Sequence, residues 1–86
     1  MRLSEWRLTQ KLTLAQCATR IGVGHARNFQ KYESGENRPD APMAERIIAM
    51  SAGAVTLTDL HEQRLEWLRR HKPDMFGVPD QMEAAE

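Results

Sequence analysis

Apolar residues recur at intervals of three and four along the chain, and turn residues separate these stretches into short segments. The first segment follows Leu3, Trp6, Leu8 and Leu12, and four more helices are expected near residues 13–21, 26–34, 42–52 and 57–71. Alternating runs rich in Val, Ile and Tyr are absent, and the β-branched pair Val55-Thr56 is short. The pattern therefore predicts an all-α fold.

Residues typical of helix ends mark the predicted boundaries. Side chains suited to helix starts are Ser4 or a neighbour, Thr13 with Gln16 in a Thr-x-x-Gln box, Asp40, and Thr56 with Asp59 in a Thr-x-x-Asp box. Stop signals are Gly22, Gly35, Gly53 and Pro73. These local signals support the division of the chain into five helices.

The last predicted helix is longer than its apolar content requires. Its apolar stripe consists of Leu57, Leu60, Leu65, Trp67 and Leu68 and is interrupted by Arg64. Since Trp67 and Leu68 lie beyond what a compact five-helix core needs, we consider Leu65, Trp67 and Leu68 candidates for a dimer interface. Simple coverage of the core is the alternative interpretation.

Length and composition restrict the class of protein. At 86 residues the chain has room for one small domain, and its single cysteine excludes an internal disulfide and a multi-cysteine zinc site. His61 and His71 lack carboxylate or cysteine companions at ligand spacing, so no metal or cofactor is expected. No apolar run reaches the roughly 18 residues of a membrane span, and the start lacks signal-peptide character. We therefore expect a cytoplasmic protein.

Charge is distributed unevenly although the net charge is zero, with 12 basic and 12 acidic residues. Residues 1–39 carry seven basic and three acidic side chains, whereas residues 73–86 carry four acidic and no basic ones. This asymmetry suits an anionic partner on one face only. We expect a folded domain over residues 1–72 and a disordered acidic tail over residues 73–86.

Residues 12–39 have the layout of a helix-turn-helix. Two short helices flank a glycine turn, and the second helix presents exposed Arg, Asn, Gln and Lys side chains. The small side chain of Ala18, four residues before Gly22, allows the two helices to approach closely. In such a motif the second helix enters the major groove of DNA.

These residues resemble the Cro/CI-type (XRE-family) helix-turn-helix. The resemblance covers residues 3 to about 61 and rests on Leu12-Thr13, Cys17-Ala18, Ile21-Gly22-Val23 and Phe29-Gln30-Lys31-Tyr32-Glu33-Ser34-Gly35-Glu36-Asn37-Arg38-Pro39. Its most specific part is the Tyr-Glu-x-Gly-x-x-x-Pro stretch. It implies a five-helix lambda-repressor-like DNA-binding domain, usually dimeric on a short inverted repeat.

The resemblance also assigns roles residue by residue. It implies base-reading positions at Ala26, Arg27, Asn28 and Lys31, with Gln30 as a lesser candidate. It implies DNA-backbone contacts at Thr13, Asn37 and Arg38, and a role for His25 as a helix cap or a backbone contact. It further implies an ion pair between Arg7 and Glu33 that orients the third helix against the first.

Two departures from the family pattern affect these assignments. The turn over residues 22–25 is one residue longer than usual, which can shift the positions of the recognition helix by one. Leu14 stands where many members have a phosphate-binding Gln, and Cys17 stands where most have Leu. We expect Cys17 to pack in the core, with redox sensing as the alternative.

The sequence thus favours a sequence-specific DNA-binding transcriptional regulator that acts as a repressor of prophage or bacterial type. Double-stranded DNA and a second copy of the chain are the expected partners. The alternative is an antitoxin or adaptor whose last helix and tail bind another protein. An enzyme is not expected, because no nucleophile, base and orienting group occur together.

Overall fold

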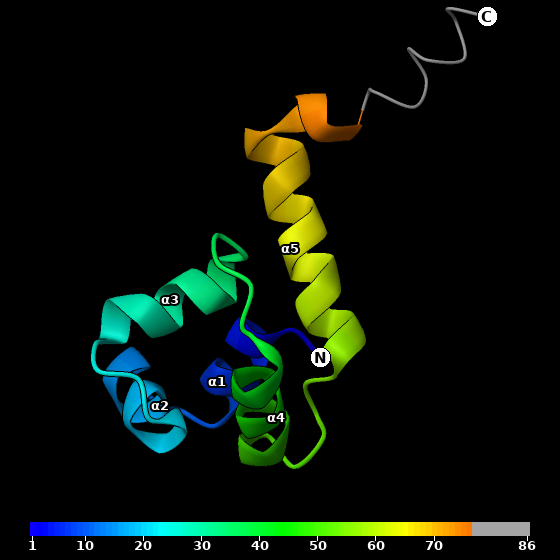
Figure 1. Ribbon diagram of the computed structural model, residues 1–86. Coiled ribbons are helices and arrows are strands. Elements are labelled where there is room, and N and C mark those ends of the chain that lie inside the picture. The colour runs from blue at the N-terminus through cyan, green and yellow to red at the C-terminus, as the bar shows by residue number, and fades with distance from the viewer. Residues whose placement is uncertain (77–86) are drawn as a thin grey trace, which may run out of the picture.

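The structure, a computed structural model, describes residues 1–76 and is helical throughout (Figure 1). Its elements are α1 (Leu3–Thr9), α2 (Leu14–Ile21), α3 (Ala26–Ser34), α4 (Ala41–Met50), α5 (Leu57–His71) and the 3₁₀-helix η1 (Pro73–Phe76). Residues 1–76 contain no β-strand, so the predicted all-α class is confirmed. None of the helices in this part of the chain is long and apolar enough to cross a membrane.

Three helices begin as their capping residues predict. The Thr13 hydroxyl accepts a hydrogen bond from the Gln16 backbone N–H at 3.0 Å, and the Gln16 side chain accepts one from the Thr13 N–H at 2.8 Å. Asp40 accepts from the Met43 N–H at 2.9 Å. The Thr56 hydroxyl accepts from the Asp59 N–H at 3.1 Å. Each bond satisfies a backbone donor that a helix start leaves unpaired.

The first helix differs from its prediction at both ends. Arg2, not Ser4, holds the N-cap position, and its backbone N–H donates to the Glu5 carboxylate at 3.3 Å. The helix ends at Thr9, because Lys11 has a left-handed backbone with φ of 57°. Leu8 lies two residues from the buried Trp6 and so faces away from the core, with 65% of its surface exposed, although it belongs to the apolar spacing of the predicted helix.

The core lies where the five helices meet. Phe29 of α3 is fully buried at its centre. The other buried apolar residues are Leu3, Trp6, Cys17, Ala18, Ile21, Ala44, Ile47, Val55 and Leu60. Full burial of a side chain as large as Phe29 contributes about 1.5–3 kcal/mol to the free energy of unfolding.

One buried polar side chain, Gln63, joins three of the helices. Its Oε1 accepts from the Leu3 backbone N–H at 2.8 Å, and its Nε2 donates to the Tyr32 carbonyl at 3.0 Å. Gln63 thereby satisfies a free donor at the start of α1 and a carbonyl near the end of α3. This contact has no local signal in the sequence.

The fifth helix extends well past the other four (Figure 1). It ends at His71, as the sequence predicts, because Pro73 follows. The first four residues of the predicted disordered tail are ordered, since Pro73–Phe76 form η1 and the Arg69 guanidinium lies 5.4 Å from the centre of the Phe76 ring. The rest of the predicted tail, residues 77–86, lies outside the described part of the chain.

Candidate nucleic-acid interface

Helices α2 and α3 form a closely packed pair joined by a short turn (Figure 1). Ala18 retains 3% of its surface exposed, and Cys17 and Ile21 are buried on the same side of α2 as Ala18. Phe29 is the buried residue of α3. The small Ala18 side chain thus lies inside the helix pair, where the sequence had placed it.

The turn between these helices depends on Gly22. This residue ends α2 with φ of 82°, a left-handed conformation that disfavours other side chains. The Val23 N–H then donates to the Ala18 carbonyl at 2.9 Å, and the Arg46 guanidinium of α4 donates to the Ile21 carbonyl at 3.2 Å. The end of α2 and the turn that leads into α3 are therefore held in place by local hydrogen bonds and by α4.

The outer face of α3 presents the side chains that the sequence singled out. Arg27, Asn28 and Gln30 are exposed, while Ala26 and Lys31 are half-buried. His25 occupies the N-cap position, but its side chain makes no capping hydrogen bond, so the capping role expected for it is not seen. Arg27 forms no ion pair with residues 1–76, which leaves its guanidinium donors available to a ligand.

Lys31 has a partner that the sequence interpretation did not include. Its Nζ lies 3.7 Å from the Glu36 carboxylate, in the loop just after α3. Both side chains remain partly accessible to solvent, at 31% and 45%, so the pair is weak and exchangeable. An anion approaching Lys31 therefore competes with Glu36.

The loop after α3 carries the other expected contacts and is held in place from α5. Asn37 and Arg38 are exposed, and the Asn37 N–H donates to the Lys31 carbonyl at 3.2 Å. The Arg64 guanidinium donates to the Gly35 carbonyl at 2.9 Å and to the Glu36 carbonyl at 2.6 Å. The interruption of the apolar stripe by Arg64 was the sequence signal for this anchor.

Thr13 lies at the exposed start of α2, some distance along the chain from α3. Its hydroxyl oxygen already accepts the capping bond from Gln16, but its hydroxyl proton remains free to donate. The structure thus leaves Thr13 able to contact an acceptor such as a phosphate oxygen.

Arg7 and Glu33 form the ion pair that the family resemblance implies. The Arg7 Nε and Nη2 both donate to the Glu33 carboxylate, the latter at 3.4 Å, and Nη1 donates to the Leu12 carbonyl at 3.0 Å. The side chains are largely buried, with 17% and 9% of their surfaces exposed. Hydrogen bonding to Glu33 is the main cause that raises the pKa of Arg7.

The three dimer-interface candidates on α5 do not share one face. Leu65 and Leu68 are half-buried and lie one turn apart on the same side. Trp67 packs near Gly35, and its ring stacks on His71 with centroids 4.3 Å apart. Trp67 therefore faces the end of α3, and Leu65 and Leu68 form a separate patch.

Cys17 is buried in the apolar core, and burial raises the pKa of its thiol. A thiol with a raised pKa supplies little thiolate at neutral pH, which favours core packing over redox sensing.

Among residues 1–76, no group of three or more His, Cys, Asp or Glu side chains is arranged to hold a metal ion.

Comparison with known proteins gives no relative. No protein-family model matches the chain, and no curated protein or solved structure matches it.

Proposed function

We propose that this protein is a sequence-specific DNA-binding transcriptional regulator of the Cro/CI type, with α3 as the recognition helix. The observation that carries the proposal is the closely packed α2–turn–α3 unit, whose second helix exposes Arg27, Asn28 and Gln30. Helices of this kind enter the major groove while the preceding helix crosses the DNA backbone. The sequence resemblance over residues 12–39 supports the same function.

The exposed donors of α3 match the acceptors of base edges. Arg27 and Lys31 are suited to guanine O6 and N7, and Asn28 is suited to adenine N6 and N7. Ala26 offers a methyl group for contact with thymine, and Gln30 is a further candidate for adenine. Thr13, Asn37 and Arg38 are placed on exposed segments flanking this helix and supply phosphate contacts.

A dimer is the form in which we expect the protein to act. Leu65 and Leu68 lie on the extended part of α5 and remain half-buried within one chain. A second copy would cover them, and two-fold symmetry would place two recognition helices on an inverted repeat. Occupation of such an operator within a promoter represses transcription.

Selection of bound duplexes from a random pool tests this function. The expected result is an inverted repeat whose half-sites lie about one helical turn apart. Arg27→Ala and Lys31→Ala should each weaken binding by about 1–3 kcal/mol and relax the preference at one base pair of each half-site.

Arg20→Ala is the control for base preference: Arg20 is an exposed arginine on α2, the helix that crosses the backbone, and forms no ion pair with residues 1–76, so its loss can weaken binding but should leave the preferred bases unchanged. It removes the same charge while leaving α3 intact. If no duplex is enriched from the pool, the proposed function is wrong. If Arg27→Ala and Lys31→Ala keep the affinity and base preference of the wild type, the assignment of these residues to base reading is wrong.

A second candidate function is capture of a protein partner, as by an antitoxin or adaptor. The observation in its favour is the exposure of Met75 and Phe76 on η1, just past the end of α5, at 59% and 36%. Deletion of residues 73–86 would abolish partner capture and leave selection of the DNA site unchanged. A deletion that alters only DNA affinity would remove the basis for this alternative.

A further inference from the structure

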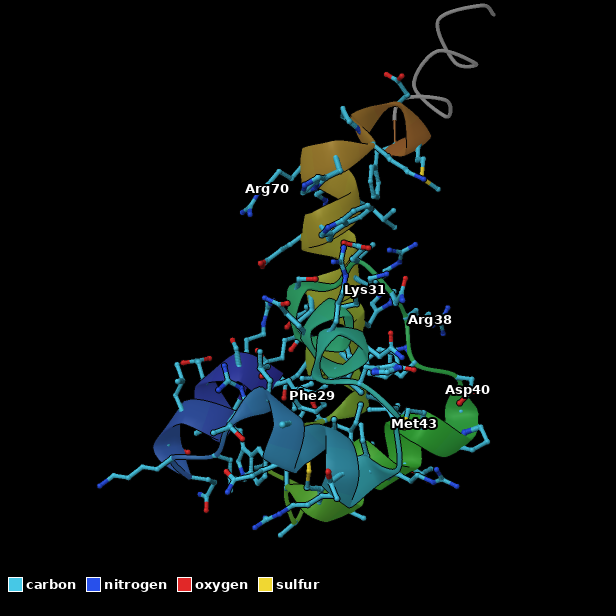
Figure 2. The ribbon with its side chains drawn as sticks, turned by 90° about the vertical axis from the view of Figure 1, so that its left-hand side faces the viewer. Phe29, Lys31, Arg38, Asp40, Met43 and Arg70 are labelled. Carbon is cyan, nitrogen blue, oxygen red and sulfur yellow. The ribbon has the colours of Figure 1, made fainter. Side chains whose placement is uncertain are left out.

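A cleft of about 470 Å³ lies between α3 and the extended part of α5. One wall comes from α3 and the loop after it, and the other from the last two turns of α5. Figure 2 shows Lys31 on α3 near the middle of the molecule and Arg70 above it on α5. The residues that line the cleft are Arg27, Gln30, Lys31, Ser34, Glu36, Trp67, Arg70 and His71.

The charge of this cleft is positive. Arg27, Lys31 and Arg70 carry positive charge, and Glu36 is the one acidic residue in the lining. Since Glu36 lies against Lys31, the other two cations are not balanced by ion pairs with residues 1–76. Arg69 and Lys72 add exposed positive charge to the same end of α5.

The α5 wall is held in a defined position. Trp67 lies against Gly35: if Gly35 carried a Cβ atom, that atom would lie 3.1 Å from the Cβ of Trp67. The His71 ring stacks on the Trp67 ring at an interplanar angle of 10°, and the Arg64 guanidinium lies 5.4 Å from the Trp67 ring centre. Arg64 is itself bonded to the carbonyls of the loop after α3. The last turns of α5 are therefore braced against the end of α3.

We propose that this cleft binds the phosphodiester backbone of DNA, with Arg70 as its principal phosphate contact on α5. The inference rests on the proposed function, because a duplex whose major groove receives α3 must place a backbone strand beside that helix. The major groove is about 12 Å wide, so the strand at its border passes close to any element packed alongside the recognition helix. The basic end of α5 is such an element.

This arrangement assigns different tasks to the two walls. Arg27 and Lys31 read bases from α3, while Arg70 contacts a phosphate and carries no base information. The Arg70 contact adds to affinity equally for every DNA sequence and increases the dependence of binding on salt. It also allows a chain without net positive charge to bind an anionic duplex, because Arg27, Lys31 and Arg70 line one cleft.

Arg70→Ala tests the proposal, measured against the wild type on the selected duplex. Arg70 is exposed and makes no ion pair with residues 1–76, and alanine is a good helix former, so the helix is retained. We expect affinity to fall about tenfold and the slope of log K against log salt to become shallower by about 0.9 for each protomer bound. The preferred base sequence should not change.

Interference footprints provide a second readout. Ethylation of one or two phosphates should block the wild type and cease to affect Arg70→Ala, while interference by methylation of guanine N7 stays the same in both proteins. Inorganic phosphate and free nucleotides at millimolar concentration should not compete with the duplex for the cleft, since the contact of Arg70 with a phosphate depends on a strand held by α3.

Three results would overturn the proposal, and they are distinguishable. If Arg70→Ala keeps the wild-type salt slope and phosphate footprint while Arg27→Ala loses affinity, the α5 end does not contact DNA and serves only to balance its helix dipole. If Arg70→Ala changes the preferred base, Arg70 reads sequence instead of backbone. If the wild type selects no duplex, the proposed function fails and this inference fails with it.

Discussion

Arg7 on α1 and Glu33 on α3, which are 26 positions apart in the sequence, form a bidentate ion pair between the two helices. The Arg7 guanidinium also donates to the Leu12 carbonyl at 3.0 Å, in the connection that leads to α2. One side chain thus ties the first helix, the entry to the second and the end of the third together. The position of α3 depends on this pair as well as on the apolar core.

Arg7→Ala should therefore destabilise the fold by about 2–3 kcal/mol, because it leaves the nearly buried Glu33 carboxylate without its partner. Urea denaturation measures the loss. Arg7→Lys keeps the charge but lacks the planar fork, so it should recover only part of the stability. A double-mutant cycle with Glu33→Ala separates the coupling of the pair from the cost of either change; coupling near zero would contradict this account.

Gly35 ends α3 at the point where α5 packs against it. Its φ is 88°, and a Cβ at this position would meet the Gln63 backbone carbonyl and the Trp67 side chain. Gly35→Ala should thus destabilise the protein by more than about 3 kcal/mol, from the left-handed backbone and the steric overlap combined.

Gly53→Ala is a matched control, because Gly53 has a similar φ of 86° with no atom within 4 Å of its added Cβ. Its cost should stay near the roughly 1–2 kcal/mol of the backbone conformation alone. The difference between the two variants, measured by denaturation, isolates the packing of α5 on the end of α3. Equal losses would show that this close packing contributes nothing.

Much of the helix pattern could be predicted from the sequence because its signals are local. The caps at Thr13, Asp40 and Thr56 each bond to a backbone N–H three residues on, so the chain between them contains the whole interaction. The spacing of apolar residues fails at Leu8, which lies two residues from Trp6 and faces away from the core, and at Leu12, because Lys11 turns the backbone left-handed and ends the helix before it. Periodicity alone does not detect such a break.

The long-range contacts are the part that local patterns do not contain. Gln63 reaches Leu3 and Tyr32 across 60 and 31 residues, and nothing in its neighbours indicates these partners. The outer face of α3 could be located by its polar residues, whereas the opposing wall from α5 depends on how two helices pack. For that reason Arg70 was not among the residues that the sequence singled out for DNA contact.

The start of α5 carries a pH-dependent contact at Asp59. Its carboxylate accepts from the N-terminal ammonium at 2.8 Å, and from the Thr56 N–H and hydroxyl at 2.9 and 3.0 Å. The bond from the ammonium is the main cause that lowers the pKa of Asp59, and the bonds from Thr56 lower it further. A carboxyl whose pKa is lowered on folding stabilises the protein above its unfolded pKa of about 3.9.

Asp59→Asn should accordingly cost about 1 kcal/mol at pH 7, a modest value because the site is near the surface. The difference from wild type should shrink as the pH falls below about 4 and through the lowered pKa of the folded state, where Asp59 becomes protonated. Thermal unfolding between pH 2 and 7 measures both curves. A difference that stays constant over this range would show that the charge of Asp59 does not contribute.

Glu36 limits the availability of Lys31, which lies 3.7 Å away on the proposed recognition helix. Glu36→Gln removes the competing carboxylate and a negative charge from the lining of the α3–α5 cleft. Because both side chains are partly solvated, stability should change by less than about 0.5 kcal/mol. DNA affinity should rise about three- to tenfold at low salt, and the gain should diminish as salt screens the charge.

Glu62→Gln serves as the control for this prediction, since it removes the same charge from an exposed site on α5 that does not line the cleft. Fluorescence anisotropy with the selected duplex, at two salt concentrations, measures both variants. Glu36→Gln should gain more affinity than Glu62→Gln, and the extra gain should vanish when Lys31→Ala is added. An equal gain in the two variants would mean that net charge alone is responsible and that Glu36 does not restrain Lys31.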